Sequence, residues 1–418
     1  QYEGKVKCIY IDPPYNTGNE GWVYNDNVND PRIKKWLGDV VGKEGEDLSR
    51  HDKWLCMMYP RLVLLHKLLA NDGVIFVSID DHEVANLRLI MDEIFGTSSL
   101  LSNVIWNSRK SVSNDAVVSL NHNHTLIYTK DLKSFNLVKA NFKLKVQDNT
   151  FSNPDNDPRG PWKADPFDSP GIRPNLTYEI RNPNTNKSYL PPSGRCWRTG
   201  PDEYQEFLSD NRIVFGRKGI SSPQLKRFLS DASAKGQTPT SLWDDVGTAT
   251  NATQEIMAIF GDKKFDTPKP TAFIERVVEL ATSSDSIILD SFAGSGTTAH
   301  AVLNLNKQDG GNRKFILIEM MDYAETITAE RVKRVMTGYG DGKNKTEGTG
   351  GAFDYYTLGA TLFNGQEQLN EEVGVERIRE YIWYSETRSP LQASTQLGSG
   401  KAASSKGPKG NPYYLGTH

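Results

Sequence analysis

The 418-residue sequence lacks a long apolar run, whereas a membrane-spanning helix needs about 18 consecutive apolar residues. Its N-terminus also lacks the basic and then apolar pattern of a signal peptide. Only three cysteines are present, Cys8, Cys56 and Cys196, and they lie too far apart to have the spacing of a metal site. Cys8 and Cys56 lie in apolar runs, as inert core thiols do. These absences argue against a membrane protein, and they predict a protein of the reducing cytoplasm.

A strong excess of charge of one sign is missing as well, since the formal net charge is −3. Any surface that binds nucleic acid must therefore be local. The hydrophobic share of 37% is that of an ordinary globular protein, and the length predicts about two or three domains. The chain enters an apolar segment within a few residues of Gln1, so we expect that an upstream segment is missing.

The first apolar segment, residues 5–11, is predicted to be a short buried strand, and it ends in Asp12-Pro13-Pro14-Tyr15. Neither proline has an N–H to donate to a neighbouring strand, so the strand stops there and its end is stiff. A carboxylate, fixed carbonyl groups and one aromatic ring are then close together. Such a cluster can grip a planar group that carries an amino function. A proline turn that merely caps a strand is the alternative interpretation.

Helical and strand periodicity alternate along much of the remaining chain. We predict helices over 53–70, 80–95 and 271–282 and one ending near 305, strands over 74–79, 104–106, 125–129, 287–289 and 315–318, and a turn at 71–73. This alternation is typical of right-handed crossovers and a parallel sheet.

Residues 143–267 interrupt the alternation, because proline, glycine, asparagine and arginine become frequent there. Arginine and aromatic residues are interleaved, which suits contact with phosphates and with base edges. An irregular insertion with a solvated, charged surface explains the same composition. We also predict a short helix at 225–229 and a long loop at 18–50.

A second corner follows the predicted strand 287–289, where a glycine turn leads from Asp290 into a helix. With a further strand and Glu319 it forms the nucleotide-binding pattern of a doubly wound sheet. Gly294 and Gly296 let the backbone approach a ligand closely, and Glu319 can hold ribose hydroxyls. Two ligands remain open: a dinucleotide, or an adenosyl group with an amino-acid tail whose cationic amine Asp290 receives.

The two corners together resemble the amino-group DNA methyltransferases that use S-adenosylmethionine. The residues that carry the resemblance are Asp12-Pro13-Pro14-Tyr15 and, far downstream, Phe292-Ala293-Gly294-Ser295-Gly296-Thr297. Their order, with an insertion between them, is similar to that of the β class. The segments 16–18, 265–270, 353–356 and 381–383 further resemble the modification subunit of type III restriction–modification systems.

The resemblance implies a Rossmann-like α/β fold with a circularly permuted, mostly parallel sheet and an inserted target-recognition domain. It implies a catalytic half over 1–142, target recognition over 143–267, a cofactor half over 268–340, a small C-terminal unit over 352–390 and a flexible or truncated tail over 391–418. Implied partners are double-stranded DNA, a second copy of the chain in a homodimer, and a restriction subunit with helicase and nuclease activity.

The resemblance also implies the roles of the site residues. Asp12 and the Pro13 carbonyl accept the N6 hydrogens of a flipped adenine, Pro14 completes the rigid corner, and Tyr15 stacks on the base. The cofactor-binding residues are Lys269, Pro270, Thr271, Asp290, Phe292, Ala293, Gly294, Ser295, Gly296, Thr297 and Glu319. We expect no metal, and we assign His122 and His124 a structural role. A plain core role for Phe292 and a helix-capping role for Glu319 are alternatives.

Other functions remain open at this stage. The chemistry also suits a solitary adenine methyltransferase, methylation of cytosine N4, or an RNA substrate. A specificity module that has lost catalysis is a different class, against which the intact Asp12 and Tyr15 speak. A dinucleotide oxidoreductase does not explain the proline corner. The methyltransferase hypothesis requires that both corners lie at one edge of one sheet and open onto one cavity.

Overall fold

The computed structural model describes residues 2–17, 50–366, 368–387 and 391. The loop predicted at 18–50 lies outside the described residues, apart from Arg50, which begins a helix. The tail predicted over 391–418 lies outside them after its first residue. None of the described helices combines the length and apolar character needed to cross a membrane.

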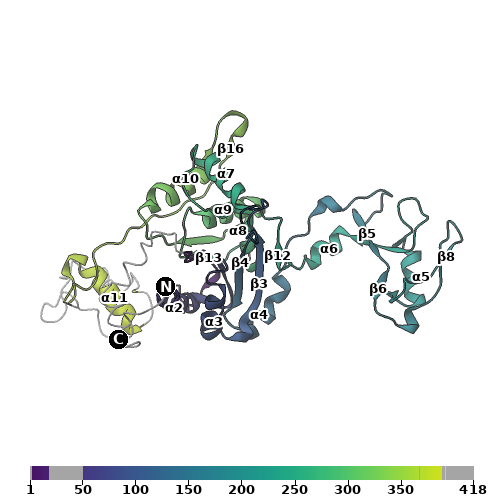
Figure 1. Cartoon of the computed structure of the whole chain (residues 1–418), viewed down its shortest axis with the longest axis horizontal. Coiled ribbons are helices and arrows are strands. Elements are labelled where there is room, and N and C mark those ends of the chain that lie inside the picture. The colour runs from purple at the N-terminus through teal and green to yellow at the C-terminus, as the bar shows by residue number, and fades with distance from the viewer. Residues whose placement is uncertain (1, 18–49, 367, 388–390, 392–418) are drawn as a thin grey trace, which may run out of the picture.

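A seven-stranded sheet forms the centre of the molecule, with the strand order β12-β3-β4-β2-β1-β13-β14 (Figure 1). β4 is antiparallel to its neighbours β2 and β3, and the other neighbouring pairs are parallel. The predicted mostly parallel α/β fold is therefore confirmed. The strands are β1 (Val6–Ile11), β2 (Leu69–Ile79), β3 (Leu100–Asn107), β4 (His122–Thr129), β12 (Leu242–Trp243), β13 (Ile287–Asp290) and β14 (Lys314–Leu317).

β1 and β13 are adjacent in this sheet although the insertion separates them in the sequence. They run parallel, with Cys8 opposite Ile288 and Ile9 opposite Leu289. Parallel neighbours end at the same edge of a sheet, so Asp12, after β1, and Asp290, at the end of β13, lie at one edge. The prediction that both corners share a sheet edge is confirmed.

Helices cover both faces of the sheet, because successive side chains of a strand point to opposite faces. Ile9 and Ile11 of β1 belong to one buried cluster, with side chains of α2 (Arg50–Leu68) and α3 (Val84–Phe95). Cys8 and Tyr10 of the same strand belong to the buried cluster on the opposite face of the sheet. The helices of that second face are α4 (Leu132–Val138), α8 (Thr271–Ala281) and α9 (Thr297–Asp309).

The insertion forms a separate unit that projects away from the sheet (right in Figure 1). It has its own buried cluster, which includes Phe167, Trp197 and Tyr204. Its elements are short: β5 (Trp162–Pro166), β6 (Asp168–Pro170), β7 (Ile180–Arg181), β8 (Ser188–Tyr189), β9 (Arg195–Trp197), α5 (Pro201–Ser209), β10 (Ile213–Val214), β11 (Gln224–Phe228) and α6 (Leu229–Lys235).

Two sequence-based expectations are wrong locally. The helix predicted at 225–229 is the strand β11, since it lies between β10 and β5 and both partners supply hydrogen bonds that local sequence does not reveal. The turn predicted at 71–73 lies within β2, where Leu69 and Val74 pair with Val6 and Cys8 of β1. The extra residues form a bulge in the strand rather than a reversal of the chain.

The last residues of the predicted recognition segment return to the main sheet. β12 pairs with β3, and α7 (Ala249–Phe260) packs its Ile259 into a cluster with α9 and α10 (Glu330–Thr337). We therefore propose that the recognition domain ends before β12. After α10 come the hairpin of β15 (Gly338–Tyr339) and β16 (Thr346–Glu347), and then α11 (Val375–Thr387), which lies on the opposite side from the insertion in Figure 1.

Candidate active site

The first corner is tied together by its own side chains. The Tyr15 hydroxyl donates to Oδ1 of Asp12 at 2.8 Å. Nε1 of Trp54, on α2, donates to the Pro14 carbonyl at 2.7 Å. Burial, followed by the negative charge of Asp12, raises the pKa of the Tyr15 hydroxyl well above its usual range, so Tyr15 stays protonated. The carboxylate therefore has a permanent donor on one oxygen.

Asn16 anchors the end of this corner. Its backbone has a φ of +62°, in the left-handed region that asparagine tolerates better than most residues. Its side-chain amide donates to Oε1 of Glu83, and both side chains are fully buried. The same carboxylate contacts His51 Nδ1 at 2.6 Å and accepts from the Asn86 amide at 2.8 Å. Glu83 is thus a buried acceptor that fixes the exit of the corner, and sequence reasoning did not single it out.

The ammonium of Lys269 reaches the same corner from the segment before α8. It forms an ion pair with Oδ2 of Asp12, and the Lys269 side chain is only 9% exposed. Its nitrogen lies 5.2 Å from the centroid of the Tyr15 ring and 5.8 Å from that of Trp106, within the range of cation–π attraction. Lys269 therefore neutralises Asp12 between two aromatic rings.

The backbone of the second corner lies close to another segment of the same chain, at Thr328. Gly294 and Gly296 have φ values of +51° and +81°, which residues with a Cβ rarely adopt. A Cβ on Gly296 would lie 3.0 Å from the Thr328 carbonyl oxygen. Glu319 ties the turn down, because its Oε2 accepts from the Gly294 N–H at 2.8 Å and its Oε1 from two backbone N–H groups that follow it.

Asp290 is the buried carboxylate of this corner, with an exposed fraction of 3%. It accepts hydrogen bonds from the Phe292 N–H at 3.0 Å and from the Thr298 hydroxyl at 2.5 Å. Burial nevertheless raises the pKa of Asp290 to about 7, with smaller contributions from the charges of Asp12 and Glu319. Its charge therefore changes near neutral pH, and a cation beside it would favour the ionised form.

One cavity of about 680 Å³ joins the two corners. The prediction that both open onto the same space is confirmed. Pro270, Thr271 and Gly296 do not line the cavity: they lie at the starts of α8 and α9. The predicted site residues that line it are Asp12, Pro13, Pro14, Tyr15, Lys269, Asp290, Phe292, Ala293, Gly294, Ser295, Thr297 and Glu319.

Aromatic side chains that sequence reasoning did not assign also line this cavity. Phe265 and Tyr323 contact each other edge to face, with ring centroids 5.4 Å apart. The Phe265 ring lies over Gly294, so that a Cβ there would meet it at 3.2 Å. Trp106 closes the side nearest to Lys269. Only Phe265 had a signal in the sequence, as part of the segment 265–270.

A fully buried arginine supports the glycine turn from the protein interior. Nη1 of Arg331, on α10, donates to the Ser295 hydroxyl at 2.9 Å and to the Thr297 hydroxyl at 2.7 Å. Burial lowers the pKa of Arg331 to about 10, which leaves it charged at neutral pH, and Glu255 lies 3.8 Å away as its counter-ion. Arg331 also contacts Nδ1 of His300 at 3.2 Å; burial, followed by the Arg331 charge, lowers the His300 pKa to about 3.

Comparison with known proteins matches the amino-acid sequence of this chain to one family. The family model described as DNA methylase matches residues 6–330. The Mod subunit of the type III restriction-modification enzyme StyLTI, from Salmonella typhimurium, is 40% identical over 328 residues, which cover 76% of this chain and 49% of that protein. The type II methyltransferase M.KpnI of Klebsiella pneumoniae is 34% identical over 344 residues, which cover 75% of both.

Among solved structures, the cytosine-N4-specific PvuII DNA methyltransferase aligns with a TM-score of 0.39 and 11% identity, covering 79% of this chain and 80% of that one. The chain spans about half the length of the Mod subunits that it matches. Because the family model covers most of the chain, and M.KpnI is similar over three quarters of both proteins, the chain belongs to the DNA methylase family.

Proposed function

We propose that this chain transfers a methyl group from S-adenosylmethionine to the exocyclic N6 of an adenine that is flipped out of double-stranded DNA. The observation that carries the proposal is the single cavity lined by Asp12 and Tyr15 on one side and by Asp290 and Gly294 on the other. A methyl donor and an acceptor base that bind in one cavity can be in direct contact, with no protein segment between them.

The acceptor nitrogen is a poor nucleophile, because its lone pair is delocalised into the adenine ring. Asp12 and the Pro13 carbonyl accept its two hydrogens, which draws the nitrogen toward tetrahedral geometry and frees the lone pair. Tyr15 stacks on the flipped base, a contact worth about 1–3 kcal/mol. As the N6–carbon bond forms, the carbon–sulfur bond breaks and its electron pair stays on sulfur. N6 then loses one proton, through the Asp12 carboxylate, to solvent.

The residues present suit this cofactor, which supplies a methyl group on a cationic sulfur when it is bound. The cavity has the volume of a typical cofactor site. Asp290 is positioned to receive a cationic amine, and Glu319 to receive ribose hydroxyls, since a carboxylate oxygen can accept more than one hydrogen bond. Gly294 presents no side chain that would obstruct a ligand. Correct alignment of the two reactants can contribute roughly 7–11 kcal/mol to catalysis.

The insertion is the element that we propose reads the DNA. Several of its arginines are already committed to ion pairs within the unit, Arg159 with Asp157 and Asp210, and Arg195 with Asp168. These arginines stabilise the unit and are not available to bind DNA phosphates. Six exposed basic residues of the unit are the ones that we propose contact DNA: Arg173, Arg181, Lys187, Arg198, Arg217 and Lys218.

The similarity to the StyLTI Mod subunit supports a role as the modification subunit of a type III restriction–modification system. We infer that the complete protein forms a homodimer in the cytoplasm and binds a restriction subunit. M.KpnI, a type II methyltransferase, supports the alternative of a methyltransferase that works without such a subunit. Copurification of a restriction subunit with the complete gene product would distinguish the two.

The test is methyl transfer by this chain to unmethylated genomic DNA, followed by mass spectrometry of the nucleosides. We expect N6-methyldeoxyadenosine, and its complete loss in Asp12→Ala with the cofactor Kd changed by less than about tenfold. N4-methyldeoxycytidine would reassign the base, and transfer to RNA alone would reassign the substrate. DNA binding without transfer to any nucleic acid would favour the silent specificity module. A thermal shift with NAD but not with S-adenosylmethionine would favour the oxidoreductase.

A further inference from the structure

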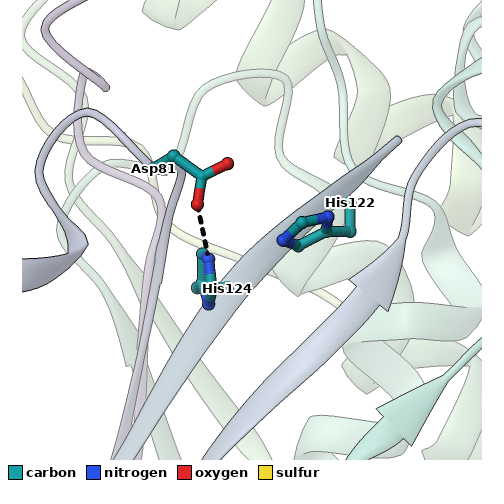
Figure 2. A group of neighbouring side chains, drawn as sticks. All are labelled: Asp81, His122 and His124. Carbon is teal, nitrogen blue, oxygen red and sulfur yellow. Dashed lines mark hydrogen bonds and ion pairs between the residues drawn. The ribbon is translucent and has the colours of Figure 1, made fainter. Parts of the chain in front are cut away.

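Three potential metal ligands converge beside the candidate active site (Figure 2). His122 and His124 lie two residues apart on β4, and side chains at this spacing point to the same face of a strand. Asp81 follows β2, whose last residue, Ile79, is paired with His124. The strand β4 and the turn that follows β2 therefore hold the three side chains, and the pairing of these two strands brings them together.

The distances are close to those of a metal site. Nε2 of His124 lies 3.0 Å from Oδ1 of Asp81, and the two imidazole rings are 5.1 Å apart, centroid to centroid. The three candidate ligand atoms all lie within 4.8 Å of one another. Bonds of about 2.0–2.2 Å in a tetrahedral zinc site separate ligand atoms by roughly 3.3 Å. Separations of up to 4.8 Å exceed this value by at most about 1.5 Å, so a small shift of the side chains would satisfy the geometry.

His124 also has the support that metal-binding histidines usually need. Its second nitrogen, Nδ1, lies 3.3 Å from Oδ1 of Asn103 on β3 and 3.2 Å from Nδ2 of the same amide. When the Nδ1 proton is donated to that oxygen, the lone pair of Nε2 is free for a cation. Such a hydrogen bond from the other nitrogen is a general feature of histidine ligands.

We propose that Asp81, His122 and His124 bind one divalent transition-metal ion of the zinc class. Imidazole nitrogen and carboxylate oxygen are ligands that zinc accepts, and three protein ligands leave a fourth position open. Asp81 and His122 both line the cavity that contains Asp12, so the open position faces the space where substrate would lie. An oxygen of a DNA phosphate is the ligand that we assign to it; this second step rests on the proposed function.

The competing explanation is that Asp81 merely holds His124 by a hydrogen bond. From the sequence alone only a structural role for the two histidines was expected, because two histidines do not make a site and Asp81 is 43 positions away from His124. The fold adds the third ligand. The two explanations differ in a measurable way, since only the metal site requires His122.

The experiment is a titration of the metal-stripped, 418-residue chain with Zn²⁺, measured by competition with a chromophoric chelator. We expect one equivalent to bind with a Kd of about 1 μM or tighter, near −8 kcal/mol. His122→Ala and Asp81→Asn should each weaken binding at least tenfold, and Asp81→Asn is nearly isosteric, so its fold should be intact. His66→Gln is the matched control, because His66 lies on α2 outside the cluster and should leave the affinity unchanged.

Absence of a bound equivalent, or equal affinity in His122→Ala and the unsubstituted chain, would overturn the metal site. The phosphate step has its own readout, fluorescence anisotropy with a random-sequence duplex. Zn²⁺ should lower the Kd for this duplex at least threefold in the unsubstituted chain and not in His122→Ala. Metal binding without any change in DNA affinity would overturn the phosphate step alone. Neither readout measures methyl transfer, so failure of the metal site or of the phosphate step can be told apart from failure of the proposed methyl transfer.

Discussion

The ammonium of Lys269 forms an ion pair with the carboxylate of Asp12, although 257 positions separate the two residues in the sequence. The same ammonium faces the ring of Tyr15. In the proposed mechanism these two groups bind the amino group and the plane of the target base. The lysine therefore occupies the position of the substrate's amino group, and it has to yield one carboxylate oxygen when a base arrives.

Substitution of Lys269 distinguishes a role at Asp12 from a role in cofactor binding. In Lys269→Met, Asp12 loses the charged partner that holds it, and a hydrogen bond to a charged group is worth about 1.5–3 kcal/mol. We expect the transfer rate at saturating cofactor to fall at least about tenfold, while the cofactor Kd changes by less than about threefold. Lys264→Met, which removes an exposed lysine paired with Asp262, is the control and should change neither value. A tenfold weaker cofactor Kd at an unchanged rate would instead place Lys269 at the methionine end of the cofactor.

Cofactor affinity should depend on pH through Asp290. The pKa of this carboxyl is raised to about 7, so the group is neutral below that pH and charged above it. Binding of a cationic amine should therefore tighten as the pH rises through 7. It should weaken again above about 8, where an α-amino group loses its own proton. Calorimetric titration with S-adenosylmethionine between pH 5.5 and 9 should show a maximum of the affinity. In Asp290→Asn the fall of affinity on the acidic side, the acid limb, should be absent. An unchanged acid limb in Asp290→Asn would assign the titration to another group.

The two ends of α9 allow a matched test of the close approach at the glycine turn. Gly296, before the helix, and Gly310, after it, have φ values of +81° and +70°. A Cβ on Gly296 would meet the Thr328 carbonyl oxygen at 3.0 Å, whereas a Cβ on Gly310 meets nothing within 4 Å. Both alanine variants bear a backbone strain of about 1–3 kcal/mol, but only Gly296→Ala should also weaken cofactor binding. Equal cofactor affinities in the two variants would show that the turn accommodates a methyl group.

Arg331 should matter for both stability and cofactor binding. Arg331→Met leaves the Ser295 and Thr297 hydroxyls without their donor and Glu255 without its counter-ion. Each buried hydroxyl left without its donor costs about 1–3 kcal/mol, and the loosened turn should raise the cofactor Kd. Thermal denaturation and calorimetry measure the two effects. Lys333→Gln, on the exposed face of α10, is the control and should change stability by less than about 0.5 kcal/mol. A similar loss in both variants would contradict a special role for Arg331.

The sequence alone determined those features that depend on a few neighbouring residues. The end of β1 follows from two prolines that cannot donate hydrogen bonds, and the glycine turn follows from positions that need a left-handed backbone. The apolar pattern located α8 and β13 almost to the residue. A helix that is buried on one face has apolar residues at helical spacing, and a buried strand is a short continuous apolar run. These local features were sufficient to predict the fold class and the two corners.

Only the tertiary structure decided which distant groups meet. Sheet order and register are set by packing over the whole chain, so local periodicity could not reveal that β4 is antiparallel or that residues 225–228 form a strand. For the same reason the partners of Lys269, Arg331 and Asp81 were not predictable. A charged side chain carries the same local signal whether it is solvated or buried against a partner. Its role is fixed only when folding removes water from one side and supplies an opposite charge on the other.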